Sequence, residues 1–204
     1  PEGERAARAR GAKILCRVAG YGQAHRAVPF GTLTGSEEAL TRAMREAILD
    51  AGMQALQNGN YQVTEENARE TGILVGTSEG ALGPGCDFEM LIAEKGNAGG
   101  SAFKFPNTVY NAAGGYLSIC AGIRGYNVTV TNGAQSGLAA IAYASGVIRE
   151  GKAAAMLATG TDENSEIIGE LYHKIGVVAD GAVAPYTKQK GFSLSDGSVS
   201  LLLE

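Results

Sequence analysis

The clearest pattern of hydrophobic and polar positions lies between residues 127 and 148. Val128 and Val130 alternate with polar neighbours, which is typical of a short strand, and small residues follow at 133–137. Apolar or small positions then recur at helical spacing, at Leu138, Ile141, Ala142, Ser145 and Ile148. The pattern predicts a strand, a sharp turn that we call the elbow (residues 133–137), and a buried helix.

Two elements are predicted near the start of the chain. Residues 13–20 read as a strand that ends at a glycine turn, with Cys16 in the core. A helix follows, because Thr34 or Ser36 can cap its start and an apolar stripe ends at Gly52. The stripe consists of Leu40, Met44, Ala47, Ile48 and Ala51. Residues 53–67 are predicted to be a polar connection.

Strands and helices are then predicted to alternate. Residues 73–75 form an apolar run typical of a strand covered on both faces, and a helix containing Phe88 is expected to end at Gly96. Pro106 and Asn107 are predicted to start a helix in which Cys120 belongs to the core and small residues at 112–115 allow close approach of another backbone. A strand at 153–158 and a helix capped by Ser165 follow. This alternation predicts an α/β fold with a mainly parallel sheet and helices on both faces.

Composition narrows the class of protein. The chain has 204 residues, of which 45% are hydrophobic, and 17 basic against 21 acidic residues. Apart from the N-terminal arginines, it offers no electrostatic footprint for nucleic acid or a membrane surface. Cys16, Cys86 and Cys120 are widely spaced, which favours a reducing, cytoplasmic location over a disulfide framework. His25 and His173 are isolated, so no metal site is predicted, and no cofactor is expected.

Several segments, in the same order along the chain, carry a family resemblance. They are residues 73–80, 106–114, 118–125, 147–153, 158–163 and 191–204. From about residue 71 to 204 the chain resembles the N-terminal half of a β-ketoacyl-acyl-carrier-protein synthase, a ketosynthase of the thiolase superfamily. The resemblance implies a thiolase-like fold, either one half or a rearranged part of the αβαβα architecture.

The chain departs from this family at the elbow. By resemblance, Ala134 stands where an active ketosynthase has its nucleophilic cysteine, and a methyl group cannot attack a thioester. Gly133, Gln135, Ser136 and Gly137 would keep the elbow geometry without its chemistry. The family's His-Gly-Thr-Gly-Thr motif is absent from this sequence, and Cys86 has no identifiable base beside it. No catalytic residue is therefore assigned.

The resemblance implies a subunit that acts by binding a partner protein. The expected function is that of a chain length factor, a non-catalytic partner that pairs with an active ketosynthase and shapes its acyl tunnel in type II polyketide or fatty-acyl assembly. By resemblance, Asn127, Val128, Thr129, Val130 and Thr131 would pair antiparallel with a partner strand. The region of Pro106, Asn107 and Asn111 would border the same interface, and an acyl carrier protein would be a further partner.

The sequence leaves two alternative functions open. With a separate C-terminal half that supplies histidines, the chain would complete a site that decarboxylates malonyl-carrier-protein thioesters. It would otherwise be a plain structural half of a split or processed ketosynthase.

The N-terminal region carries a second family resemblance, at an unexpected place in the chain. Residues 8–14 and 18–22 resemble the start of a ketosynthase's C-terminal half, which permutation, joined fragments or the pseudo-symmetry of the two halves would each explain. We expect residues 1–12 to be a linker or short helix and residues 13–204 to form the ketosynthase-like domain.

Overall fold

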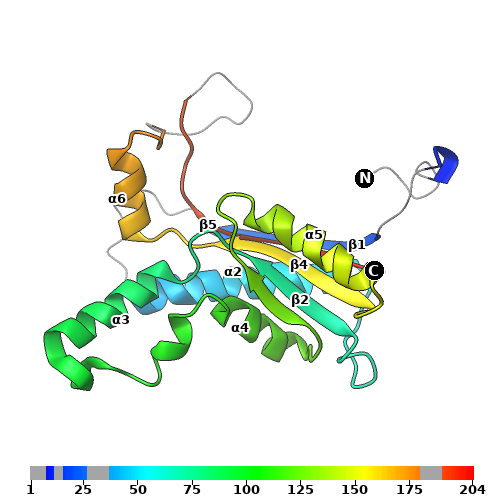
Figure 1. The fold of residues 1–204 in the computed structure, drawn as a ribbon, viewed down its shortest axis with the longest axis horizontal. Coiled ribbons are helices and arrows are strands. Elements are labelled where there is room, and N and C mark those ends of the chain that lie inside the picture. The colour runs from blue at the N-terminus through cyan, green and yellow to red at the C-terminus, as the bar shows by residue number, and fades with distance from the viewer. Residues whose placement is uncertain (1–7, 12–15, 27–36, 180–189) are drawn as a thin grey trace.

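A computed structural model describes residues 8–11, 16–26, 37–179 and 190–204. Its strands are β1 (Val18–Arg26), β2 (Thr71–Gly76), β3 (Asn127–Val130), β4 (Ala155–Asp162) and β5 (Asp196–Leu203). Its helices are α2 (Glu37–Asn58), α3 (Leu82–Lys95), α4 (Ala112–Ala121), α5 (Ser136–Arg149) and α6 (Glu166–Lys174). Two short 3-10 helices, η1 (Gly96–Gly99) and η2 (Phe105–Asn107), connect α3 to α4 (Figure 1).

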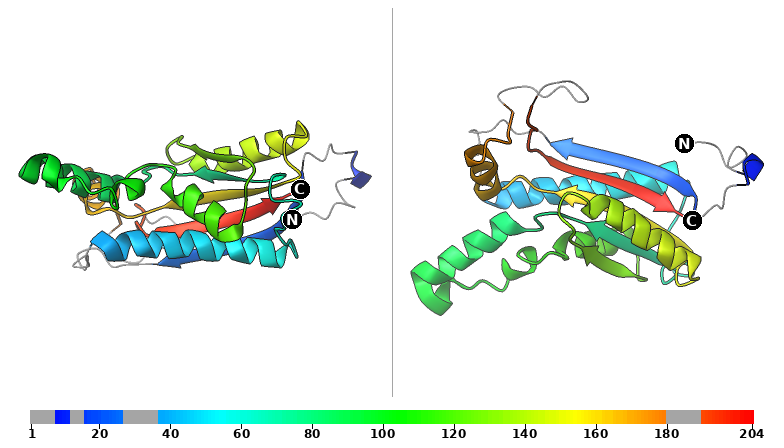
Figure 2. Two further views of the ribbon diagram at one scale, coloured as in Figure 1. Left: turned by 90° about the horizontal axis from the view of Figure 1, so that it is seen from below. Right: turned by 45° about the horizontal axis from the view of Figure 1, so that its top comes forward.

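The strands form one mixed sheet in the order β1-β5-β4-β2-β3. β2 pairs in parallel with β3 and β4, whereas β5 runs antiparallel to both β4 and β1. Helices α2 and α4 cover one face of the sheet and α5 lies on the other (Figure 2). The predicted α/β fold is therefore confirmed, but the sheet is mixed and not mainly parallel, because two of its four strand pairings are antiparallel. β3 is an edge strand of the described sheet.

A separate hydrophobic core lies on each face of the sheet. Ile73 and Val75 of β2 pack with Ile48 of α2 and Leu117 of α4 on one side. On the other side, Leu74 packs with Ala140 and Ala144 of α5, Met156 and Leu203. Successive residues of β2 therefore point into opposite cores, as the predicted doubly covered strand requires.

The prediction for the first strand was wrong in its boundaries. β1 begins at Val18 and runs through both Gly20 and Gly22, whereas residues 12–15 lie outside the described part of the chain. A Cβ atom on Gly20 would lie 1.8 Å from the carbonyl oxygen of Ala55, and one on Gly22 would lie 1.9 Å from that of Ala51. These glycines therefore allow α2 to lie directly on the strand instead of making a turn.

Helix α2 also differs from its prediction, because it continues through Gly52 to Asn58. A Cβ atom on Gly52 would lie 2.6 Å from Cδ1 of Leu117, so this glycine admits a side chain of α4. The predicted buried positions Ala47, Ile48 and Ala51 are confirmed. The predicted capping residues Thr34 and Ser36 lie outside the described residues.

The region between α3 and α4 confirms some predictions and corrects others. Gly96 ends α3 with a φ of 61°, as predicted. Pro106 and Asn107 belong to η2, and α4 starts only after Asn111. Cys120 is exposed, so its predicted place in the core was wrong, because the helix turns Leu117 to the sheet instead.

The predicted inner face of helix α5 is only partly correct: Ile141 and Ile148 pack against the core, whereas Leu138 does not. Ala140 and Ala144 pack against the sheet, while Leu138 is 71% exposed and Tyr143 is 61% exposed. The sequence of α5 is apolar or small up to Arg149, so periodicity alone did not distinguish the inner from the outer face.

Candidate functional site at the elbow

The elbow lies where β3 ends and α5 begins. Gly133 adopts a left-handed conformation with a φ of 55°, and the chain then turns into the first residue of α5, Ser136. Ala134 is exposed at this bend. The predicted strand, turn and helix are confirmed, with β3 ending one residue before Thr131.

The buried side chain of Ser136 stabilises the elbow through two hydrogen bonds. Its side-chain oxygen accepts a hydrogen bond from the Asn132 N–H at 2.8 Å and donates one to the Gly133 carbonyl at 2.7 Å. Only 2% of this residue is exposed. A buried hydroxyl that satisfies two backbone groups of a tight turn fixes the shape of that turn.

A second network anchors the elbow to the sheet. Ser78 donates through its hydroxyl to the Gly133 carbonyl at 2.8 Å. One carboxylate oxygen of Asp162 in turn accepts three hydrogen bonds, from the Thr77 hydroxyl and from the N–H groups of Ser78 and Glu79. Asp162 therefore has a structural role, and it places the loop that holds the elbow.

Close backbone approach brings α5 onto the ends of the central strands. A Cβ atom on Gly76 would lie 2.1 Å from the carbonyl oxygen of Ser136, and one on Gly160 would lie 3.3 Å from Cα of Gly137. Only residues without a side chain allow this contact at Gly76. The glycines at the ends of β2 and β4 thus fix where the N-terminus of α5 sits.

An open groove with a volume of about 310 Å³ runs beside the elbow. Ala134 lines it together with residues at the ends of four strands. The other lining residues are Gln23, Gly76, Ser78, Gly137, Gly160, Thr161, Asp162, Ser195, Gly197, Ser198 and Val199. Sequence analysis missed the contributions of Gln23, Ser195 and residues 197–199, because they depend on the antiparallel pairing of β1 with β5.

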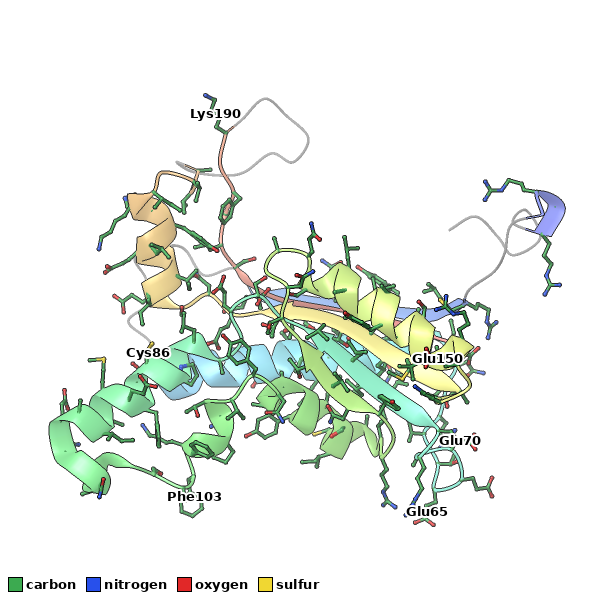
Figure 3. The ribbon with its side chains drawn as sticks, viewed as in Figure 1. Glu65, Glu70, Cys86, Phe103, Glu150 and Lys190 are labelled. Atoms are coloured by element: carbon green, nitrogen blue, oxygen red, sulfur yellow. The ribbon has the colours of Figure 1, made fainter. Side chains whose placement is uncertain are left out.

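The groove lies at the N-terminus of α5 and is also lined by the carboxylate-bearing residue Asp162 of β4. The N-terminus of α5 carries the positive end of the helix dipole, and no side chain caps it. The side chain at the bend is the methyl group of Ala134. Cys86 lies on α3, away from the elbow (Figure 3), and is half-buried.

A buried carboxyl group, Glu163, lies just beyond the groove. It is 7% exposed and accepts a hydrogen bond from the Gly83 N–H at 3.2 Å. Burial, with smaller contributions from Asp196, Asp162 and Asp87, raises the pKa of Glu163 to about 7, although the hydrogen bond from Gly83 opposes this rise.

The predicted interface residues lie on two segments that both form hydrogen bonds with α4. Asn127 and Val128 of the edge strand are exposed, Thr129 and Val130 are half-buried, and the Asn127 side chain donates to the Gly114 carbonyl of α4 at 3.2 Å. Pro106 and Asn111 are exposed, while the Asn107 side chain accepts a hydrogen bond from Tyr116 at 2.5 Å. Their role in a partner contact stays a prediction.

Other candidate chemistry is limited in the described part of the chain. Residues 8–11, 16–26, 37–179 and 190–204 contain no group of three or more His, Cys, Asp or Glu side chains arranged to hold a metal ion. None of the helices described there has the length and apolar character needed to cross a bilayer. His173 is exposed at the end of α6, as predicted.

The sheet order, the elbow and the helices on both faces define a thiolase-like ketosynthase fold. Residues 7–204 match the family model for the N-terminal domain of β-ketoacyl synthases, and the chain belongs to this family. Among curated proteins, it is 33% identical over 162 residues to 3-oxoacyl-[acyl-carrier-protein] synthase 2 of Vibrio harveyi, which covers 76% of this chain and 39% of the relative. The mitochondrial 3-oxoacyl-[acyl-carrier-protein] synthase of Arabidopsis thaliana is 29% identical over 197 residues, covering 87% of this chain and 42% of the relative.

Solved structures share the fold at low sequence identity. A β-ketoacyl synthase from Burkholderia phymatum matches with a TM-score of 0.71 and 16% identity, covering 93% of this chain and 58% of that protein. A ketosynthase in complex with its chain length factor from Xenorhabdus doucetiae matches with a TM-score of 0.61 and 18% identity, covering 94% of this chain and 79% of the matched chain. The chain spans about two fifths of the length of the curated relatives it matches.

Proposed function

We propose that this chain is a non-catalytic, chain-length-factor-like subunit that pairs with an active ketosynthase and shapes its acyl tunnel in type II polyketide or fatty-acyl assembly. The observation that carries the proposal is the methyl group of Ala134 at an otherwise intact elbow. The hydrogen bonds of Ser136 and Ser78 maintain the turn although it presents no nucleophile. A fold that keeps this geometry without a reacting atom contributes through shape and association.

The edge strand supports an association role. The Ile73 N–H donates to the Tyr126 carbonyl and the Thr77 N–H donates to the Val130 carbonyl. Because alternate residues of a parallel edge strand bond to their neighbour, the N–H and C=O groups of Asn127 and Thr129 point away from β2. These groups are available to pair with an antiparallel strand of a partner, which would cover the open edge.

The test uses Thr129→Pro, which removes one outward N–H while leaving the bonds between β3 and β2 in place. Proline is tolerated at such positions of an edge strand, and Thr129→Val is the matched control because it keeps the N–H. Native mass spectrometry of the chain co-expressed with an active ketosynthase should show a heterodimer for the unchanged chain and for Thr129→Val. It should show mainly separate subunits for Thr129→Pro with an unchanged circular dichroism spectrum. A monomer in every case would refute the proposed association.

The uncovered face of α5 favours the second candidate function. Leu138 and Tyr143 are both more than half exposed on a helix that carries no charge before Arg149, and helices of this kind are normally buried on all sides. A C-terminal-type ketosynthase half that covers this face and supplies histidines would complete a site that decarboxylates malonyl-carrier-protein thioesters. The N–H at Ala134 would then stabilise the oxyanion.

One assay distinguishes the two candidate functions. Carbon dioxide release from radiolabelled malonyl carrier protein would be measured with the cysteine of the ketosynthase blocked by alkylation. Release that requires this chain, and that disappears when Gly137→Phe fills the groove beside Ala134, would favour the decarboxylase. Release that is unchanged without this chain would leave the non-catalytic subunit as the better account.

A further inference from the structure

The contact between Glu163 and the start of α3 lies outside the elbow chemistry. Helix α3 has no side-chain cap, since Ala81 occupies the N-cap position. The Glu163 carboxyl group, which follows β4, instead receives the Gly83 N–H at 3.2 Å. A side chain from the sheet thus supplies the acceptor that the first turn of this helix lacks.

The environment of this carboxyl group disfavours its charged form. The residue is 7% exposed, and its second oxygen, Oε2, is buried without a hydrogen-bond partner. The charged groups that act on it are Asp196 of β5, Asp162 of β4 and Asp87 of α3 itself. A buried carboxylate with one donor and negative neighbours on three elements is poorly solvated when ionised.

The helix held by Glu163 continues into a projecting segment that we call the α3 arm (residues 82–107), formed by α3, η1 and η2. The arm carries Phe103, which is 94% exposed and extends away from the sheet (Figure 3). The rings of Phe88 and Phe105 contact each other at a centroid distance of 6.0 Å, which ties the returning chain to α3. The ring contact therefore joins η2 to the helix that Glu163 holds.

We propose that Glu163 in its protonated form holds the start of the α3 arm against the end of β4, and that ionisation of this carboxyl group releases the first turn of α3. In the fastened state the neutral carboxyl accepts the Gly83 N–H at no charge cost. After ionisation, opening of the first turn lets water reach the carboxylate. The contact is therefore a pH-sensitive element of the fold that is independent of any reaction at the elbow.

The size of the effect follows from the linkage between proton binding and opening. The pKa of Glu163 is about 7 when the turn is closed, against an ordinary value of 4.5 when the carboxyl is in water. With these values, the equilibrium constant for opening rises about tenfold between pH 6 and pH 8. Pro106 and Asn107 belong to the same arm, so under the proposed function the affinity for the partner would fall over this pH range.

The experiment needs no partner, so its outcome does not depend on the proposed function. Hydrogen exchange of the Gly83 and Gly85 amides would be measured by NMR from pH 6 to pH 8 and divided by the intrinsic exchange rates to give the opening constant. The unchanged protein should show a rise of about tenfold. Glu163→Gln, which keeps an acceptor for Gly83 and cannot ionise, should show none. Glu166→Gln, an exposed acid at the start of α6, should behave as the unchanged protein.

Two results would overturn the proposal: an opening constant that does not change with pH in the unchanged protein, or the same rise in Glu163→Gln. If Glu163→Gln does not fold, carbon-13 NMR of the Glu163 carboxyl in the unchanged protein decides the matter. A carboxyl midpoint near 7, shared by the amide shifts of the first turn of α3, supports the proposal. A midpoint near 4.5 refutes it.

Discussion

Replacement of Ser136 by alanine tests whether the elbow is held by its buried hydroxyl. The change removes two hydrogen bonds, the one accepted from the Asn132 N–H and the one donated to the Gly133 carbonyl. Gly133 retains the hydroxyl of Ser78 as a donor, whereas the Asn132 N–H loses its side-chain acceptor. Each lost hydrogen bond costs about 1 kcal/mol, but Asn132 and Gly133 are exposed, so water replaces part of what is lost. The higher helix propensity of alanine offsets a further part. We expect a net loss of about 1 kcal/mol.

The matched control lies in the same helix. Ser145 also donates its hydroxyl to the carbonyl three residues earlier, that of Ala142, but it accepts nothing from a turn. Ser145→Ala should therefore change stability by less than about 0.5 kcal/mol. Urea unfolding followed by circular dichroism gives the free energy, and hydrogen exchange of the Asn132 amide gives the local opening.

A double-mutant cycle sharpens the test. Ser78→Ala alone leaves the Gly133 carbonyl bonded to Ser136, but Ser78→Ala combined with Ser136→Ala leaves it with neither donor. The double variant should lose more than the sum of the single losses, by about 1 kcal/mol. The reasoning fails if Ser136→Ala is as stable as Ser145→Ala and its Asn132 amide remains as protected as in the unchanged protein.

Three further predictions concern neighbouring groups. In Ala134→Cys, iodoacetamide at pH 7 should alkylate the new cysteine faster than the exposed native Cys120, because the N-terminus of α5 favours the thiolate. Peptide mass spectrometry measures both alkylation rates, and equal rates would contradict the placement of residue 134 at the elbow. Asp162→Ala should lower the free energy of unfolding, measured in urea, by about 3 kcal/mol, because three donors lose their shared acceptor oxygen. Asp162→Asn should lower it by about half as much. Equal losses in the two variants would argue against a stabilising role for these hydrogen bonds. Because the pKa of Glu163 is raised, the folded state binds more protons than the unfolded state between pH 4.5 and 7. The contribution of this group to stability is therefore highest below pH 4.5 and falls by about 2.5 kcal/mol between pH 5 and pH 8. This fall in the free energy of unfolding should vanish in Glu163→Gln.

Local signals in the sequence were sufficient for several elements. The alternation at Val128 and Val130 followed by small residues located the elbow, and Gly96 and Ser165 marked the end of α3 and the start of α6. These predictions succeeded because each depends on the backbone preference or side-chain chemistry of a few adjacent residues.

Glycines misled the prediction wherever their role was packing. Gly20 and Gly52 were expected to end elements, yet both lie inside regular structure and admit a neighbouring chain. Contact with Ala55 or Leu117 depends on residues far away in the sequence. A turn glycine and a close-approach glycine cannot be distinguished before that partner is known.

The sequence by itself determined the chemistry of this protein's elbow: a methyl group at residue 134, a hydroxyl at residue 136 and an apolar helix after them. Only the tertiary structure decided which face of α5 meets the sheet, how β5 brings β1 beside the groove, and that Glu163 is buried among other carboxyl groups. The physical reason is that the side chain and its immediate backbone fix local chemistry. Burial and charge environment, in contrast, arise from contacts between distant segments, and those contacts set the pKa of Glu163 and the shape of the groove.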